Sequence, residues 1–163
     1  MIMNTVRKDN IVVIFKCDVS DKDSVSEGAR VARDAFGDVT ILINNAGIVS
    51  GKKLLEISDF MMKKTIEVNT LAHLYTIREF MPAMIRANRG HIVSICSVAG
   101  LFGTAGLTDY SASKFGAFAI DEALRLEIRK MNYNINTTCI CPYFINTGMF
   151  EGVKGRWPLR ILD

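Results

Sequence analysis

The stretch His91-Ile-Val-Ser-Ile-Cys-Ser97, followed by Tyr110-Ser-Ala-Ser-Lys114, decides the fold of this chain. The apolar run before Ser97 is typical of a buried strand, so the Ser97 hydroxyl is expected at the strand's carboxyl end. In open α/β sheets, ligands bind at that end of the strands. Tyr110 and Lys114 are four residues apart and share one face of a helix. A cation beside a phenol lowers its pKa from about 10, which makes the phenol a workable general acid or base.

Apolar strands and amphipathic helices alternate along the rest of the chain. The strands are continuously apolar, which predicts an α/β fold with a parallel sheet covered on both faces. Pro82 predicts a kink or a restart within its helix. The predicted strands are Ile11–Phe15, Val39–Ile43, His91–Ile95 and Asn136–Cys141; the predicted helices run from a cap at Ser20 or Asp21 to Gly37, from Ser58 to about Asn88 with a break near Asn69, and over Tyr110–Met131.

Length and composition indicate one globular domain, residues 1–163, with 49% apolar and 23% charged residues. The net charge is +3 and the basic residues are scattered, so nucleic acid is not an expected partner. No apolar run reaches the roughly 18 residues that span a bilayer, so we expect no membrane insertion by these residues. The two histidines read as structural, and no metal site is expected. The cysteines read as reduced, buried thiols rather than disulfides or metal ligands: Cys17, Cys96, Cys139 and Cys141.

Five motifs in order resemble the short-chain dehydrogenase/reductase family, from Ile11 to about Phe150. They are Asn44-Asn45-Ala46-Gly47 after one strand, Asn69 in the next helix, Ser97 after the following strand, Tyr110 and Lys114. The resemblance implies a dinucleotide-binding, Rossmann-type domain and an oxidoreductase that uses NAD or NADP.

The same resemblance implies a role for each catalytic residue. Tyr110 is implied as the proton donor or acceptor, while Lys114 lowers its pKa and holds the nicotinamide ribose. Ser97 is implied to bind the substrate oxygen. Asn69 is implied to anchor a water in the proton relay, although a buried asparagine that bridges helix and strand backbone is the alternative reading. The cofactor carries the redox chemistry, and the protein supplies position and charge.

The implied cofactor contacts come from three segments of the chain. Asn44 and Asn45 also have a structural reading, because they can satisfy backbone groups at a strand end. After Pro142 the family usually has glycine, and here Tyr143 stands there. The full set of implied contacts is Asp18, Val19, Asn44, Asn45, Ala46, Gly47, Tyr110, Lys114, Pro142, Ile145 and Thr147.

Short local stretches narrow the resemblance to one branch of the family, the one that contains epidermal retinol dehydrogenase and the type 11 17-beta-hydroxysteroid dehydrogenase. Ile-Cys-Ser97-Val-Ala-Gly and Phe115-Gly-Ala-Phe-Ala carry this likeness. It implies a small lipophilic substrate, retinol- or steroid-like, and a place in lipid metabolism at the endoplasmic reticulum or lipid droplets. A cytoplasmic location is the alternative. It also implies a homodimer through the long helices, residues 58–88 and 110–131.

The sequence does not contain the family's Thr-Gly-x-x-x-Gly-x-Gly turn, which binds pyrophosphate at a helix N-terminus. We therefore expect a partial doubly wound sheet lacking the first two strands, truncated at both ends. Ile11–Phe15 then either moves beside Val39–Ile43 or belongs to a chain of marginal stability. For this chain alone we expect a cofactor dissociation constant in the millimolar range or weaker, which is a binding free energy of roughly −4 kcal/mol or less favourable. The alternative function is an inactive truncated fragment or a helix-mediated dimerisation partner.

Overall fold

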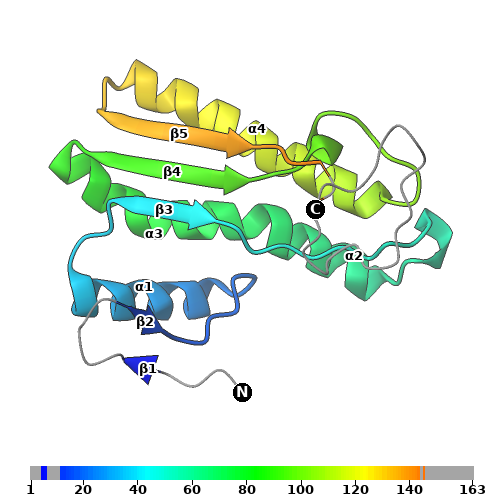
Figure 1. Cartoon of the computed structure of the whole chain (residues 1–163), viewed down its shortest axis with the longest axis horizontal. Coiled ribbons are helices and arrows are strands. Elements are labelled where there is room, and N and C mark those ends of the chain that lie inside the picture. The colour runs from blue at the N-terminus through cyan, green and yellow to red at the C-terminus, as the bar shows by residue number, and fades with distance from the viewer. Residues whose placement is uncertain (1–4, 7–11, 144, 146–163) are drawn as a thin grey trace.

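A three-stranded parallel sheet forms the centre of the protein (Figure 1). The computed structural model describes residues 5–6, 12–143 and 145. The strands β3 (Ile41–Asn44), β4 (Gly90–Ile95) and β5 (Ile135–Ile140) lie in the order β3-β4-β5. Ile41 lies opposite His91, and Gly90 lies opposite Ile135. The prediction of a partial, Rossmann-type parallel sheet is confirmed.

Four helices connect the strands at the places the sequence predicts. The break expected near Asn69 is confirmed, because a π-helical turn there separates two α-helices. The sequence predicts a kink or a restart at Pro82; the restart is wrong, since the helix continues through Pro82, and the kink stays a prediction. The buried neighbours Ala83 and Met84 hold the turn despite the lost backbone hydrogen bond. The elements are α1 (Lys22–Phe36), η1 (Leu54–Glu56), α2 (Asp59–Ile66), η2 (Glu67–Leu71), α3 (Ala72–Ala87), η3 (Val98–Gly100) and α4 (Thr108–Lys130).

Local residue chemistry sets both ends of α1. The Asp21 carboxylate accepts hydrogen bonds from the backbone N–H groups of Asp23 and Ser24, which satisfies two donors of the first turn. Gly37 ends the helix with φ 76°, a left-handed conformation that glycine adopts without strain. These are the two ends that the sequence predicts.

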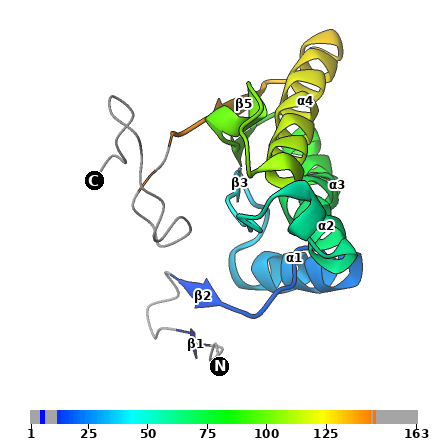
Figure 2. The ribbon, with the colours of Figure 1, turned by 90° about the vertical axis from the view of Figure 1, so that its right-hand side faces the viewer.

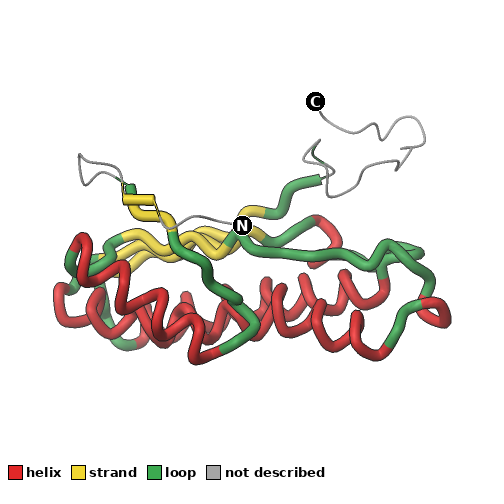
Figure 3. Tube along the Cα trace, turned by 90° about the horizontal axis from the view of Figure 1, so that it is seen from below, coloured by secondary structure: helices red, strands yellow, loops and turns green. Residues whose placement is uncertain are grey.

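The helices cover one face of the sheet, as Figures 2 and 3 show. Ile92 on β4 faces the helices and is 0% exposed, whereas Ile41 and Ile43 on β3 face the other way and are each 60% exposed. The prediction of cover on both faces is therefore wrong for the described residues, because the strands are apolar on both sides but only one helical layer packs against them. The core lies between that layer and the sheet: Leu42, Ile77, Met84, Ile92, Ile128 and Ile135.

The predicted first strand does not join the parallel sheet. Within Ile11–Phe15 only Val13–Ile14 is a strand (β2), and it pairs antiparallel with Thr5–Val6 (β1) in a separate ribbon. The expectation that this segment moves beside Val39–Ile43 is wrong. An antiparallel partner a few residues away costs less loop-closure entropy than a distant parallel one. Phe15 instead packs on α1, where a Cβ at Gly28 would lie 2.6 Å from its ring.

No helix in the described part of the chain has the length and apolar character to cross a bilayer.

Candidate active site

Three of the four predicted catalytic residues lie around one cavity at the carboxyl end of the sheet. Ser97 directly follows Cys96 at the end of β4 and caps η3, where its Oγ accepts a hydrogen bond from the Ala99 N–H at 3.1 Å. Tyr110 and Lys114 project from the first turns of α4. The cavity has a volume of about 450 Å³ and is lined by Asn45, Ala46, Gly47, Ile95, Cys96, Ser97, Tyr110, Lys114, Pro142, Tyr143 and Ile145.

The Tyr110 side chain is buried and packs with Ala99 and Leu107. Burial raises the pKa of its phenol above the usual value, and a hydrogen bond with Ser97 offsets that rise only in part. The prediction that Lys114 brings the pKa of Tyr110 below its usual value is wrong for this structure. Desolvation dominates at Tyr110, because its depth of burial favours the neutral phenol.

Lys114 is 3% exposed, which is unusual for an ammonium group. Its Nζ donates a hydrogen bond to the Ile95 carbonyl oxygen at 2.8 Å and lies 5.7 Å from the centre of the Tyr110 ring. Burial lowers the pKa of Lys114. Gly100 permits this arrangement, since a Cβ there would lie 2.7 Å from the Lys114 carbonyl oxygen. The tyrosine and lysine that the sequence paired are therefore both buried and line the same cavity.

Asn69 does not line the cavity but holds the loop that does. Its Oδ1 accepts from the Ile48 N–H at 2.8 Å, and its Nδ2 donates to the Ile48 carbonyl oxygen at 2.8 Å and to Ser113 Oγ at 2.9 Å. The Asn69 side chain is fully buried. This is the backbone-bridging position that the sequence allowed, and the water-anchoring role stays a prediction.

The predicted cofactor contacts divide between two cavities. Asn45, Ala46, Gly47, Pro142 and Ile145 line the cavity of Ser97, whereas Val19 and Asn44 line a smaller one of about 100 Å³ beside it. Asn45 and Ala46 line both. Asn44 Oδ1 accepts from Thr76 Oγ1 at 2.7 Å, which is a bond to a side chain and not to the backbone groups that the structural reading expected.

One described residue among the predicted contacts, Asp18, lies elsewhere. The Asp18 carboxylate accepts hydrogen bonds from the Ser20 N–H at 3.0 Å and from Lys64 Nζ at 3.3 Å, and it lines neither cavity. The hydrogen bonds with Ser20 lower the pKa of Asp18. Thr147 lies outside the described residues.

Asp109, the residue before the tyrosine, also belongs to the site, although no sequence motif points to it. Its carboxylate accepts from Ser50 Oγ at 2.9 Å and from Thr65 Oγ1 at 3.1 Å. These bonds tie the loop after Gly47 and helix α2 to the start of α4. The only sequence signal for this role is that Asp109 directly precedes Tyr110. Its two hydrogen-bond partners are 44 and 59 residues away, so no local sequence pattern predicts these contacts.

The histidines and cysteines are partly or fully buried within the fold. His73 is buried, and desolvation lowers its pKa to about 4. His91 Nε2 lies 2.8 Å from Thr138 Oγ1. All four cysteines are free thiols; Cys96 is buried and the other three are partly exposed. In the part of the chain that the structure describes, no group of three or more histidine, cysteine or acidic residues is arranged to hold a metal ion.

A Rossmann-type parallel sheet with a cavity at the carboxyl ends of its strands is typical of nucleotide-binding folds. The model of the short chain dehydrogenase family matches residues 2–156 of this chain. The chain belongs to the short-chain dehydrogenase family, as the sequence motifs predict.

Curated relatives include retinol dehydrogenases. Human epidermal retinol dehydrogenase 2 is 51% identical over 153 residues, which cover 91% of this chain and 49% of that protein. Short-chain dehydrogenase/reductase family 16C member 6 of Bos taurus is 44% identical over 155 residues, 94% of this chain and 49% of that protein. Retinol dehydrogenase 10-B of Danio rerio is 46% identical over 146 residues, with 89% and 44% covered. The chain spans about half the length of these relatives.

Solved structures share the fold. A metagenomic short-chain oxidoreductase in complex with NADP is 32% identical, with a TM-score of 0.72, and the match covers 78% of this chain and 57% of that one. A short-chain dehydrogenase from Streptomyces avermitilis, 24% identical, has a TM-score of 0.77 over 83% of this chain and 49% of that one. The second likeness concerns the fold alone.

Proposed function

We propose that this chain carries the proton-transfer half of an oxidoreductase that acts on the CH–OH group of a lipophilic alcohol, or on its carbonyl, with NAD or NADP. The observation that carries the proposal is the meeting of Ser97, Tyr110 and Lys114 at one cavity. The hydroxyl of Ser97, the phenol of Tyr110 and the ammonium of Lys114 come from separate places in the chain, and packing brings them together at a sheet end.

In this proposal Tyr110 exchanges the proton with the substrate oxygen, and Ser97 binds that oxygen. The raised pKa of Tyr110 keeps the phenol protonated at neutral pH, which suits a donor to a carbonyl. In the direction of alcohol oxidation the phenolate has to form, and the adjacent ammonium of Lys114 favours it electrostatically. Burial strengthens that attraction because water is excluded.

The cavity fits the nicotinamide-ribose end of a dinucleotide. Ala46 has only a methyl side chain and Gly47 has none, which lets a ring approach the backbone, and Lys114 offers ammonium N–H donors to ribose hydroxyls. A nicotinamide bound there supplies hydride transfer, while the residues of this chain hold and orient it. Asn45, Pro142 and Ile145 complete the proposed contacts at this end. Asp18, Val19 and Thr147 remain proposed contacts for the rest of the cofactor.

The names of the relatives favour retinol as the substrate class, because two of the three proteins compared above are retinol dehydrogenases. A steroid-like alcohol is the finer alternative within the proposal. Ile95, Pro142 and Ile145 give the cavity apolar walls that suit either lipophilic ligand. By the same likeness we place the protein at the endoplasmic reticulum or lipid droplets, with the cytoplasm as the alternative.

A chimera tests the substrate and the cofactor. It embeds residues 1–163 in the remaining residues of human epidermal retinol dehydrogenase 2, of which the match covers 49%. Turnover of all-trans-retinol and of a 17β-hydroxysteroid is measured with NAD⁺ and with NADP⁺, and glycerol is the polar control alcohol. We expect turnover of a lipophilic alcohol and none of glycerol. Equal rates with all three alcohols would contradict the substrate class.

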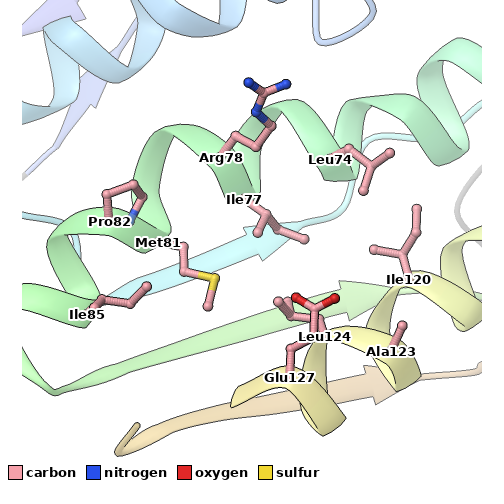
Figure 4. Close-up of a pocket in the computed structure, with 10 residues that line it drawn as sticks. All are labelled: Leu74, Ile77, Arg78, Met81, Pro82, Ile85, Ile120, Ala123, Leu124 and Glu127. Carbon is pink, nitrogen blue, oxygen red and sulfur yellow. The ribbon is translucent and has the colours of Figure 1, made fainter. Parts of the chain in front are cut away.

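We also propose a homodimer through the long helices. An apolar groove of about 540 Å³ runs between α3 and α4, and Figure 4 shows Ile77, Met81, Ile120 and Leu124 pointing into it. Leu74 at its end is 41% exposed. Arg78 and Glu127 border the groove, so two copies related by a two-fold axis can pair opposite charges at its rim. Packing against a second copy would remove this apolar surface from water, which favours association.

Sedimentation velocity tests the dimer. We expect Leu74→Glu to shift the protein toward monomer, because it puts a charge in an apolar contact. Leu55→Glu is the matched control, since Leu55 is 98% exposed and lies on η1, away from the groove. A parent that sediments as a monomer at all concentrations, or equal effects of the two substitutions, would contradict the interface.

A further inference from the structure

Three thiols lie together at the carboxyl ends of β4 and β5, beside the proposed active site. The Cys139 sulfur on β5 is 3.1 Å from the Cys96 sulfur and 3.8 Å from the Cys141 sulfur. Cys96 follows β4 and is buried, whereas Cys139 and Cys141 are partly exposed. The catalytic chemistry proposed above uses none of these sulfurs.

The position of Cys96 links this cluster to the cavity. Cys96 lies between Ile95, whose carbonyl oxygen accepts from Lys114 Nζ at 2.8 Å, and Ser97. Its own N–H donates to the Ile140 carbonyl oxygen at 2.8 Å, so its backbone is fixed between β4 and β5. Cys96 itself lines the cavity. A displacement of Cys96 is therefore expected to shift its neighbours, the Ile95 carbonyl that accepts from Lys114 and the residue Ser97.

We propose that Cys96 and Cys139 form a reversible disulfide that switches the geometry of the Ser97–Lys114 cavity; the regulatory part of this proposal rests on the proposed function. The two sulfurs are already in contact, and a disulfide requires them to approach to about 2.05 Å. The pair is a modification site whose reactant is a low-molecular-weight disulfide.

The exchange is balanced in two steps. The thiolate of Cys139, the more accessible sulfur, attacks the oxidant disulfide, forms a mixed disulfide and releases one small thiolate. The thiolate of Cys96 then attacks the Cys139 sulfur and releases the second small thiolate. Both cysteine protons pass to solvent or to the released thiolates. The protein thiols lose two electrons, and the oxidant disulfide is reduced to two thiols.

Burial and, to a smaller extent, the surrounding charges set the pH dependence of this exchange. Burial raises the pKa of both the Cys96 and the Cys139 thiols, so the pair stays protonated and reacts slowly at neutral pH. Lys114 lowers the pKa of Cys96, whereas Asp121 and Cys141 raise it. Deprotonation is required for attack, so the rate of oxidation is expected to rise as the pH rises above neutrality.

Disulfide mapping of the whole chain tests the pair. The protein is incubated with glutathione disulfide, unreacted thiols are blocked, and cross-linked peptides are identified by mass spectrometry. We expect a Cys96–Cys139 link in the parent and in Cys141→Ser, and its loss in Cys139→Ser. A link that requires Cys141, or mixed disulfides with glutathione alone, would overturn the assignment.

Hydrogen exchange of the amides at residues 95–100 tests the consequence. We expect oxidation to change their exchange rates in the parent, dithiothreitol to restore them, and Cys139→Ser to show no change. A link that forms and leaves these rates unaltered would overturn the switch.

In the chimera described above, oxidation is expected to lower turnover about a hundredfold, because a displacement of about 1 Å misplaces the catalytic groups. A chimera without activity before oxidation would refute the proposed function alone, since the mapping does not depend on turnover.

Discussion

The two faces of the central sheet are both apolar, but in the described part of the chain they differ in whether helices cover them. The face under α3 and α4 buries Leu42 and Ile92, and at its carboxyl end it holds Tyr110 and Lys114 in fixed places. The opposite face exposes Ile41 and Ile43, and no described helix packs on it. Both faces carry apolar side chains, but only the covered one has a core.

The comparison shows that the proposed chemistry depends on one layer of helices. Tyr110 and Lys114 come from α4, Asn69 comes from η2, and Ser97 leaves β4 toward the same layer. The open face contributes none of these side chains. The catalytic geometry is therefore expected to respond to changes on the covered face and to tolerate changes on the other.

The largest difference is expected between two isoleucines on neighbouring strands. Ile92→Ala removes a fully buried side chain and leaves a cavity, so we expect it to lower the free energy of unfolding by about 4 kcal/mol. Ile43→Ala, on the open face, is the matched control and is expected to cost less than about 1 kcal/mol. Urea unfolding measures both. Equal losses would show that the open face is covered in solution.

The burial of His73 on the covered face makes the stability of the fold depend on pH. Burial lowers its pKa to about 4 in the folded protein from the usual histidine value of 6.5, so the unfolded state takes up its proton first as the pH falls. Its contribution to stability is complete above pH 6.5 and is lost as the pH falls toward 4; the loss is on the order of 3 kcal/mol.

Urea unfolding at several pH values measures this loss. We expect His73→Gln to flatten the curve of unfolding free energy against pH between pH 6.5 and 4. A parent whose stability does not change over that range would contradict the burial of a neutral imidazole.

A smaller effect is expected at Asp109, which ties the cavity loop to α4. Asp109→Ala leaves the Ser50 and Thr65 hydroxyls without their acceptor, and we expect it to destabilise the protein by about 2 kcal/mol. Asp109→Asn keeps the shape and one acceptor oxygen, so a loss of about 1 kcal/mol is expected. Thermal unfolding followed by circular dichroism separates the two. A larger loss in the asparagine variant would contradict these hydrogen bonds.

The sequence was sufficient to predict what depends on local pattern. The spacing of Tyr110 and Lys114 placed them on one helix face, and the apolar run before Ser97 placed that serine at a strand end. The break near Asn69 also followed from local signals. These features are encoded within a few residues, and the structure has each of them.

The remaining features depend on distant partners. The pairing of Val13–Ile14 with Thr5–Val6 and the exposure of β3 are decided by which segments pack together, which apolar runs do not specify. The pKa of Tyr110 was predicted in the wrong direction, because the sequence shows a neighbouring lysine but does not show the depth of burial. Asp109 was missed for a similar reason, since both its partners are remote.

The turnover of Tyr110→Phe in the chimera tests the central claim, that the covered face alone supplies the proton-transfer group. Tyr110→Phe keeps the ring and its packing with Leu107 but removes the hydroxyl. We expect turnover of the lipophilic alcohol to fall about a thousandfold while cofactor binding is retained, because general acid–base catalysis contributes a factor of this order. Tyr75→Phe, on α3, is the control and is expected to keep parental turnover. Turnover of Tyr110→Phe within about tenfold of the parent, less than general acid–base catalysis contributes, would contradict the account.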